Sequence, residues 1–202
     1  VKMQRCRGLA ALRHLIFPTR ARRSWKNGNA LMLRGVSTPT PLAYLRFSRG
    51  IFDRTDFFVA EALKDGQRLE EFVRGELAGP SPERKEFISQ LALLLRGMHK
   101  SGIHHGDLKA NNILVRRENG HPVIYLVDLD GLKVKREVRF RDRVKDLARL
   151  NAALFKLSHP RDRLLFWRIY SRGISKARGR GYLRAIERLT LRKLRQKSGE
   201  LF

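Results

Sequence analysis

Residues 113–127, ILVRRENGHPVIYLV, have the pattern of a β hairpin, and this segment constrains the fold more than any other. Two apolar runs flank Asn119-Gly120, a dipeptide typical of a tight turn between antiparallel strands. Asn112 comes directly before the first predicted strand, and Asp128 comes directly after the second. Because paired strands lie about 4.8 Å apart, we expect both residues at the same open end of the hairpin.

The loop in front of this hairpin adds further polar side chains to the same end. Asp107 stands five residues before Asn112, and Lys109 lies between them. The side chains of Asp107, Asn112 and Asp128 are therefore expected to converge, with Asp130 close behind. Carboxylate and amide oxygens suit magnesium, and Lys109 is placed to neutralise charge on a transferring phosphoryl group. Asp and Asn also favour turns and caps, which explains any one of them alone better than the joint pattern.

The remaining segments predict strands early in the chain and helices late. The predicted elements are a basic helix over 20–34, strands over 42–47 and 57–63, a short helix over 69–74, a long amphipathic helix from Pro82 to Gly102, and further helices from about Asp142. The break GELAGPSP precedes the long helix and is a plausible boundary between lobes.

The net charge of the chain indicates which classes of partner it can bind. It carries 44 Lys and Arg against 19 Asp and Glu, a net charge of +25. Such a surface attracts polyanions, and nucleic acid, anionic membrane and acidic glycans all fit that description. The sequence has no zinc-finger spacing and no aromatic–basic RNA signature, which argues against nucleic acid. The single cysteine, Cys6, excludes an internal disulfide. No apolar run approaches the roughly 18 residues of a membrane span, and no signal peptide is expected.

The segments HGDLKANN and LVDLDG together resemble the catalytic loop and metal-binding segment of the protein-kinase-like superfamily. The usual form is H-R-D-L-K-x-x-N, and here Gly106 replaces the Arg, as in aminoglycoside phosphotransferases and atypical bacterial kinases. The resemblance implies that Asp107 orients or deprotonates the acceptor hydroxyl and that Lys109 contacts the γ-phosphate. It also implies that Asn112 and Asp128 hold magnesium.

Three other segments resemble further parts of that superfamily. FVAEALKDGQRLEEFV is similar to the hinge strand and following helix, which implies that the backbone of Glu61 and Leu63 meets adenine. RDRVKDLARL resembles the helix whose acid, here Asp146, braces the catalytic loop. The opening residues VK resemble the end of the strand that carries the ATP-orienting lysine, which implies that role for Lys2. Asp130 stands where many kinases have Gly, and its role stays open.

A narrower resemblance is to the bacterial lipopolysaccharide core kinases, the Kdo and heptose kinase family. It rests on RARRSWKNGNALMLRGVSTPTPLAYL, HGDLKANNILV and DLARLN, and it spans nearly the whole chain. It implies an α+β, two-lobe protein-kinase-like fold. Residues 1–64 would form a truncated N-lobe with a small antiparallel sheet plus one helix. Residues 65–202 would form a mainly helical C-lobe with the catalytic hairpin and a basic helical tail.

The resemblance implies a function but also shows departures from the pattern. The implied activity is ATP-dependent phosphoryl transfer, with Mg²⁺, to a hydroxyl of an inner-core Kdo or heptose. The implied partners are the core glycolipid and the anionic inner-membrane surface, with the protein cytoplasmic and peripheral to that membrane. No Gly-rich phosphate loop is present, and Ser24 stands where related enzymes often have the glutamate that pairs with the ATP-orienting lysine. Candidates for a membrane-facing basic surface are Arg20, Arg22, Arg23, Arg178, Arg180, Arg184, Arg188 and Arg192.

Two other functions stay open at this point. One is a small atypical protein kinase, and the other is a degenerate kinase fold that serves as a binding module. The missing Gly-rich loop and glutamate favour the binding module and leave open whether the chain as given is active. The chain nevertheless retains all four residues of the motif, which argues against a pure binding module. They are Asp107, Lys109, Asn112 and Asp128. The sequence decides neither the hydroxyl that is phosphorylated nor the oligomeric state.

Overall fold

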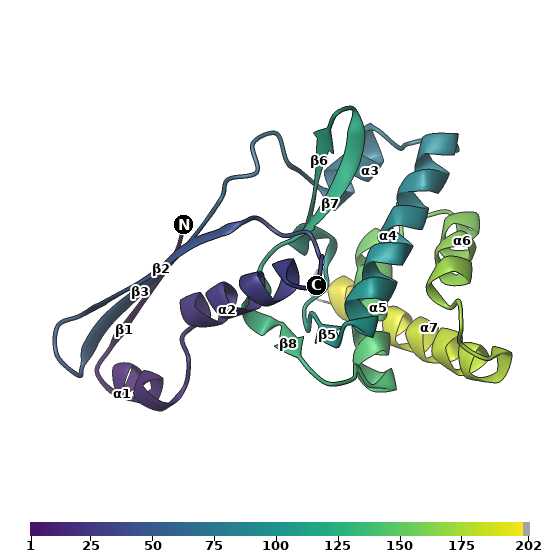
Figure 1. The fold of residues 1–202 in the computed structure, drawn as a ribbon. Coiled ribbons are helices and arrows are strands. Elements are labelled where there is room, and N and C mark those ends of the chain that lie inside the picture. The colour runs from purple at the N-terminus through teal and green to yellow at the C-terminus, as the bar shows by residue number, and fades with distance from the viewer. Residues whose placement is uncertain (200–202) are drawn as a thin grey trace.

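The computed structural model of the protein describes residues 1–199, and its elements fall into two parts (Figure 1). In the N-terminal part, two helices lie beside a three-stranded antiparallel sheet. In the C-terminal part, helices surround a small sheet that contains the predicted hairpin. The α+β class expected from the sequence is confirmed. The boundary between residues 64 and 65 stays a prediction, and residues 200–202 of the predicted C-lobe lie outside the described part of the chain.

The N-terminal sheet consists of β1 (Lys2–Arg7), β2 (Pro41–Ser48) and β3 (Asp53–Ala60), with β3 in the centre. The sequence predicts the β2–β3 hairpin, but its range for the second strand, 57–63, is wrong at both ends. The polar residues at the start of β3 are typical of a loop, and the sequence therefore predicts too long a connection. In the structure only residues 49–52 lie between the two strands. Asp56 is fully buried because the guanidinium of Arg46 donates to both of its oxygens, at 2.9 and 3.0 Å. This ion pair lets a charged residue occupy the inner face of the strand.

Two helices, α1 (Leu9–Ile16) and α2 (Arg20–Met32), connect β1 to β2. The sequence predicts only one helix in this part, so the expectation of one helix is wrong and α1 is a correction. Its eight residues are few for a periodic signal, and Arg13 and His14 interrupt the apolar run. The helix follows Gly8, whose φ of 58° suits a glycine.

The connection to the second part contains β4 (Gln67–Arg68) and α3 (Leu69–Gly75), and it leads into α4 (Pro82–Lys100). The start of α4 is as predicted, because the hydroxyl of Ser81 accepts a hydrogen bond from the backbone N–H of Arg84 at 3.0 Å. Past its end, Gly102 has a φ of 78°, and a Cβ there would collide with the carbonyl of Lys135. A glycine is therefore required between the long helix and the catalytic loop.

The small sheets and turns of the second part hold the polar loop. They comprise the hairpin β6 (Ile113–Glu118) and β7 (His121–Leu126), the short strands β5 (Ile103–His104) and β8 (Lys133–Val134), and the 3-10 helices η1 (Ala110–Asn112) and η2 (Leu129–Gly131). Asn119 and Gly120 both have positive φ, 52° and 83°. This is the backbone that a two-residue turn between twisted strands needs, so the predicted hairpin and its turn are confirmed.

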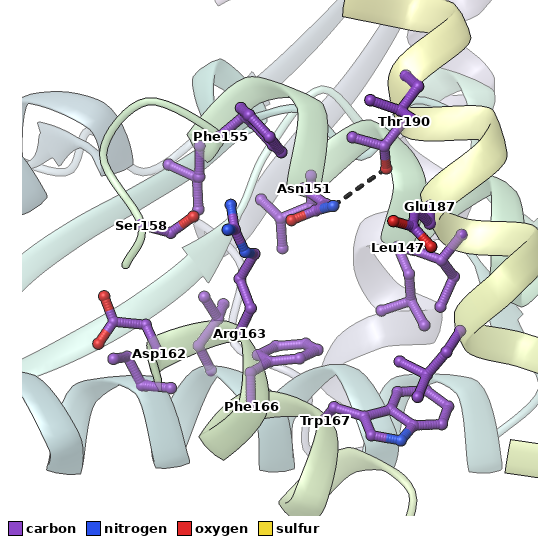
Figure 2. Close-up of a pocket in the computed structure, with 17 residues that line it drawn as sticks. Leu147, Asn151, Phe155, Ser158, Asp162, Arg163, Phe166, Trp167, Glu187 and Thr190 are labelled. Carbon is purple, nitrogen blue, oxygen red and sulfur yellow. Dashed lines mark hydrogen bonds between the residues drawn. The ribbon is translucent and has the colours of Figure 1, made fainter. Parts of the chain in front are cut away.

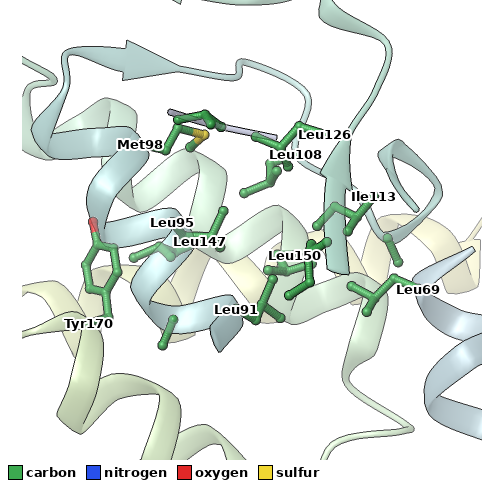
Figure 3. Close-up of a cluster of buried hydrophobic side chains, with 14 of the residues drawn as sticks. Leu69, Leu91, Leu95, Met98, Leu108, Ile113, Leu126, Leu147, Leu150 and Tyr170 are labelled. Carbon is green, nitrogen blue, oxygen red and sulfur yellow. The ribbon is translucent and has the colours of Figure 1, made fainter. Parts of the chain in front are cut away.

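Helices α5 (Phe140–Leu154), α6 (Pro160–Tyr170) and α7 (Lys176–Gly199) complete the fold. Figure 3 shows part of the core, to which α4 contributes Met98, α5 contributes Leu147 and the hairpin contributes Leu126. Leu108 and Ile113, which flank the polar loop in sequence, are fully buried in the same core. Each such side chain stabilises the fold by about 1.5–3 kcal/mol relative to exposure. The loop between them is therefore anchored on both sides.

Candidate active site

Asn112 and Asp128 lie side by side at the open end of the β6–β7 hairpin, as the sequence predicts. The backbone N–H of Val127 donates to the carbonyl of Asn112 at 3.0 Å, and Ile113 pairs with Leu126 one position further in. Asp128 has left-handed backbone angles, φ 56° and ψ 59°, which few non-glycine residues adopt. Its side chain is 47% exposed, so a ligand can reach it.

Asp107 and Lys109 lie at the same end. The amide of Asn112 donates to the backbone carbonyl of Asp107 at 2.8 Å and to its Oδ2 at 3.4 Å. The ammonium of Lys109 lies 3.0 Å from the same Oδ2. The structure thus brings together the four residues of the loop and hairpin that the sequence singled out. Their catalytic and metal-binding roles stay predictions.

Lys2 reaches this group from the N-terminal sheet. Its Nζ lies 2.7 Å from Oδ1 of Asp128 and 3.5 Å from Oδ2 of Asp130. The hydrogen bond from Lys2 lowers the pKa of Asp128 below its usual range and outweighs the opposing effect of burial. Lys2 stands at the start of β1, which continues to Arg7, and not at the end of that strand as the sequence comparison implied. Its position beside Asp128 nevertheless agrees with a role at phosphate groups.

Asp130 belongs to the site, which the sequence left open. Besides its contact with Lys2, its carboxylate lies 3.6 Å from Nε of Arg20, and its backbone carbonyl accepts from Nε of Arg23 at 2.9 Å. These two arginines of α2 are therefore turned toward η2, which weakens their candidacy for a membrane-facing surface.

Helix α2 is fastened to η2 through backbone carbonyls rather than through a lysine–glutamate pair. The side-chain amide of Asn27 donates to the carbonyls of Leu129 and Leu132, at 2.7 and 3.1 Å. Ser24, at the position where the glutamate was expected, is buried, and its hydroxyl has no hydrogen-bond partner within the described residues. The sequence alone does not identify Asn27 as this link, because its backbone carbonyl partners leave no sequence signal.

Asp146 of α5 holds the backbone of the loop that precedes Asp107, as expected. It is fully buried and accepts hydrogen bonds from the backbone N–H groups of His105, at 2.9 Å, and Gly106, at 3.1 Å. Nδ1–H of His104 donates to it at 2.9 Å, and Nε2–H of His99 at 3.3 Å. Burial alone would raise the pKa of Asp146, but the hydrogen bonds from the two histidines hold it well below its usual range. A permanently ionised carboxylate therefore fixes the backbone next to Asp107.

Two buried histidines in this region are structural. Burial lowers the pKa of both His99 and His105, so they stay neutral near pH 7. The hydroxyl of Tyr170, whose pKa burial raises to about 12, lies 2.8 Å from Nδ1 of His99. His105 lies 3.2 Å from the carbonyl of Val127 and so joins the loop to the hairpin. Neither histidine is placed as a nucleophile.

The predicted hinge residues lie between the two sheets. The backbone N–H of Glu61 donates to the carbonyl of Thr40 at 2.9 Å. In return, the hydroxyl of Thr40 donates to the carboxylate of Glu61 at 2.8 Å. Leu63 lies beyond β3, and its carbonyl accepts from Gly66 at 3.2 Å. These bonds order the connection, and adenine binding there stays a prediction.

The donor set fits magnesium held mainly by phosphates and water. Within residues 1–199 no cluster of three or more His, Cys, Asp or Glu residues could hold a metal ion by itself. Mg²⁺ is commonly bound by one or two protein oxygens together with substrate phosphates. The amide nitrogen of Asn112 is occupied by Asp107, which leaves the Oδ1 of Asn112 and the carboxylate of Asp128 as the predicted ligands.

A separate cavity of about 520 Å³ lies among α4, α5, α6 and α7 (Figure 2). Apolar side chains, including Phe155, Phe166 and Trp167, form most of its wall. At one side the amide of Asn151 donates to the hydroxyl of Thr190 at 3.1 Å. The sequence reasoning missed this cavity, because the apolar faces of these helices predict a filled core equally well.

Comparisons with known proteins agree with the geometry. A family model described as the lipopolysaccharide kinase (Kdo/WaaP) family matches residues 10–170. The chain is 30% identical over 129 residues to a 3-deoxy-D-manno-octulosonic acid kinase from Xylella fastidiosa, covering 63% of this chain and 47% of that protein. It is 36% identical over 77 residues to the protein kinase gsk3 of Schizosaccharomyces pombe, covering 38% of this chain and 19% of that protein. The chain thus spans less than half the length of these curated relatives.

Among solved structures, the chain is similar to WaaP in complex with acyl carrier protein. The TM-score is 0.68 with 26% identity, and the match covers 90% of this chain and 76% of that one. The truncated two-lobe kinase-like fold expected from the sequence is thereby confirmed.

Proposed function

Since the chain belongs to the lipopolysaccharide kinase (Kdo/WaaP) family, we propose that it transfers the γ-phosphate of ATP to a hydroxyl of an inner-core Kdo or heptose. The observation that carries this proposal is the convergence of Asp107, Asn112 and Asp128 at one end of the hairpin. Lys109 and Lys2 add positive charge on either side of that group.

Each residue has a distinct task in this mechanism. Asp107 accepts the hydroxyl proton of the sugar while that oxygen bonds to the γ-phosphorus and the bond to ADP breaks. Lys109 stabilises the charge that develops on the phosphoryl oxygens. Lys2 positions the phosphates, while Asn112 and Asp128 supply the protein ligands for the metal. When bound, ATP supplies the phosphoryl group and Mg²⁺ neutralises the charge of its phosphates.

The direct test is transfer of labelled phosphate from ATP to purified core oligosaccharide by the full-length protein. Asp107→Asn is expected to lower kcat by about 10² to 10⁴-fold, the usual contribution of a positioned general base. Asp65→Asn, a change of an exposed aspartate in the connection, is the control and keeps full activity. Unaltered turnover in D107N would remove the catalytic assignment. Transfer to a protein acceptor and not to the saccharide would favour the protein-kinase alternative.

We propose further that the protein works at the cytoplasmic face of the inner membrane, as a peripheral protein. No helix within the described residues is both long and apolar enough to cross a bilayer. The β2–β3 turn carries exposed Ile51 and Phe52, 56% and 52% exposed, beside Arg49. The backbone N–H of Gly8, which precedes α1, donates to the carbonyl of Phe52 at 2.9 Å, so α1 adjoins the turn (Figure 1). Aromatic and basic residues on one protruding tip suit an anionic bilayer surface.

An acyl carrier protein is a second candidate partner. The similar WaaP structure contains one, and the cavity among α4–α7 has a mainly apolar wall. Mixing the protein with acylated and unacylated carrier protein, followed by size-exclusion chromatography, tests this partnership. Co-elution with neither form would argue against it.

A further inference from the structure

Positive charge gathers on one side of Asp107. Lys109 contacts one carboxylate oxygen at 3.0 Å, and Nε of Arg149 lies 3.9 Å from the other. The guanidinium of Arg149 also donates to the backbone carbonyl of Gly106, the residue before Asp107. Two cations from two different elements, the loop and α5, are therefore held against the predicted catalytic aspartate.

Helix α7 adds a third cation to the electrostatic surroundings of Asp107. Burial lowers the pKa of Lys193, and the positive charge of Arg149 acts in the same direction, as does that of Lys109. The negative charge of Asp107 opposes them. Lys193 therefore lies within electrostatic range of Asp107, on a helix that packs against α5. Such a cluster gains stability when an anion enters it.

The packing of α5 against α7 fixes the two helices that carry Arg149 and Lys193. The hydrogen bond from Asn151 to Thr190 joins the two helices at their crossing (Figure 2). Thr190 is buried, and Lys193 follows it by three residues, less than one helical turn. Arg149 precedes Asn151 by two residues. The cluster is consequently part of the rigid helical body and not of a free tail.

The cations on the other side of the site are already engaged by the protein. Lys2 pairs with Asp128, Arg20 lies beside the carboxylate of Asp130, and Arg23 donates to the backbone carbonyls of Pro18 and Asp130. The excess positive charge lies instead beside Asp107, where the acceptor hydroxyl must bind. The position of the excess therefore points to the acceptor and not to the nucleotide.

We infer that Arg149 and Lys193 form an anion subsite that binds the acidic group of the acceptor sugar, next to the hydroxyl that Asp107 activates. This inference rests on the proposed function and specifies its substrate. Arginine binds carboxylate and phosphate through two parallel N–H donors, and lysine adds a point charge. Lys109 is left for the transferring phosphoryl group. The subsite would select acceptors with a carboxylate or phosphate near the reacting hydroxyl over neutral sugars.

Kinetics of the full-length protein with paired acceptors test the subsite. The acceptors are a deacylated core saccharide ending in Kdo, its carboxyl-reduced form, a phosphorylated heptose saccharide and its dephosphorylated form. Lys193→Gln is expected to raise KM for the charged acceptors at least tenfold while KM for ATP stays within twofold. It should also erase the preference for charged over neutral forms. Lys176→Gln removes the same charge from an exposed position at the start of α7 and leaves both constants unchanged.

Calorimetric binding of the same saccharides without ATP separates this inference from the proposed function. If the wild type binds a charged saccharide and K193Q binds it at least tenfold more weakly, the subsite stands, even when no phosphate is transferred and the kinase proposal fails. The pair that shows discrimination, carboxylate or phosphate, identifies the anion. Equal binding of charged and neutral saccharides by the wild type overturns the subsite, as does unchanged binding by K193Q in a protein that retains its melting temperature.

Discussion

The ammonium of Lys2 lies 2.7 Å from a carboxylate oxygen of Asp128, although the two residues are 126 positions apart in the chain. The pair joins the first strand of the N-terminal sheet to the end of the catalytic hairpin. In the proposed mechanism, a nucleotide bound between the two parts would place its phosphates beside this lysine, as protein kinases do with theirs.

Replacing Lys2 by Met is expected to raise KM for ATP at least tenfold and to leave KM for the acceptor near its wild-type value. The reason is that the lysine contacts phosphate oxygens and not the sugar. Steady-state kinetics with varied ATP measure the effect. Lys26→Met, which removes an exposed lysine from α2, is the control. An ATP dependence identical to that of the wild type would show that Lys2 only pairs with Asp128.

Asn27→Ala is expected to lower the free energy of unfolding by about 1–3 kcal/mol, since it leaves two carbonyls without their donor. It should also raise the magnesium concentration needed for half-maximal activity, because η2 carries the residue that follows Asp128. Urea denaturation and a magnesium titration measure the two effects. Asn29→Ala removes a hydrogen bond to a carbonyl of its own helix and is the matched control. Equal losses in the two variants would mean that Asn27 contributes only to α2 itself.

The stability of the protein should fall as the pH drops below about 6.5. The pKa values of His99 and His105 are lowered in the folded state, while an unfolded histidine has a pKa of about 6.5. Below that pH the unfolded chain binds more protons than the folded one, so acid favours unfolding. Asp146, whose pKa is also lowered, adds a further loss below about pH 4.

Urea denaturation at pH 7.5, 6 and 5 measures this dependence. His105→Phe removes one titrating group and should reduce the slope between pH 6 and 5 by up to about 1.4 kcal/mol per pH unit. Gln196→Ala, at an exposed position on α7, changes no titrating group and should keep the wild-type slope. A slope that is the same in all three proteins would contradict the account.

The double variant Ile51→Ser, Phe52→Ser is expected to weaken binding to vesicles of phosphatidylglycerol and phosphatidylethanolamine at least tenfold. Turnover of deacylated, soluble saccharide should not change, because the turn lies at the far end of β3 from the site. Vesicle co-sedimentation measures the binding. Leu164→Ser, which removes an exposed leucine from α6, is the control. If Arg188→Glu abolishes vesicle binding while the double variant does not, the basic tail is the membrane contact instead.

The local parts of the site were predictable, and the parts that depend on distant pairing were not. Asn119-Gly120 identifies the turn, and this places Asn112 beside Asp128 without any structure. Asp56 reads as part of a polar loop because its partner Arg46 comes from the neighbouring strand. The approach of Lys193 to Asp107 depends on how α7 crosses α5, and helix crossings leave no periodic signal in sequence. Helix α1 was missed because its eight residues span little more than two turns.

The hydrogen bond between Asn151 and Thr190 has an evolutionary consequence. It ties the α7 lysine to a helix that also braces the reaction loop, while the groups at the phosphates come from β1 and the hairpin. If the proposed subsite is correct, a change at position 193 can alter the acceptor preference without disturbing the groups that meet the phosphates. Relatives that act on different acceptors are then expected to differ first at this position of α7.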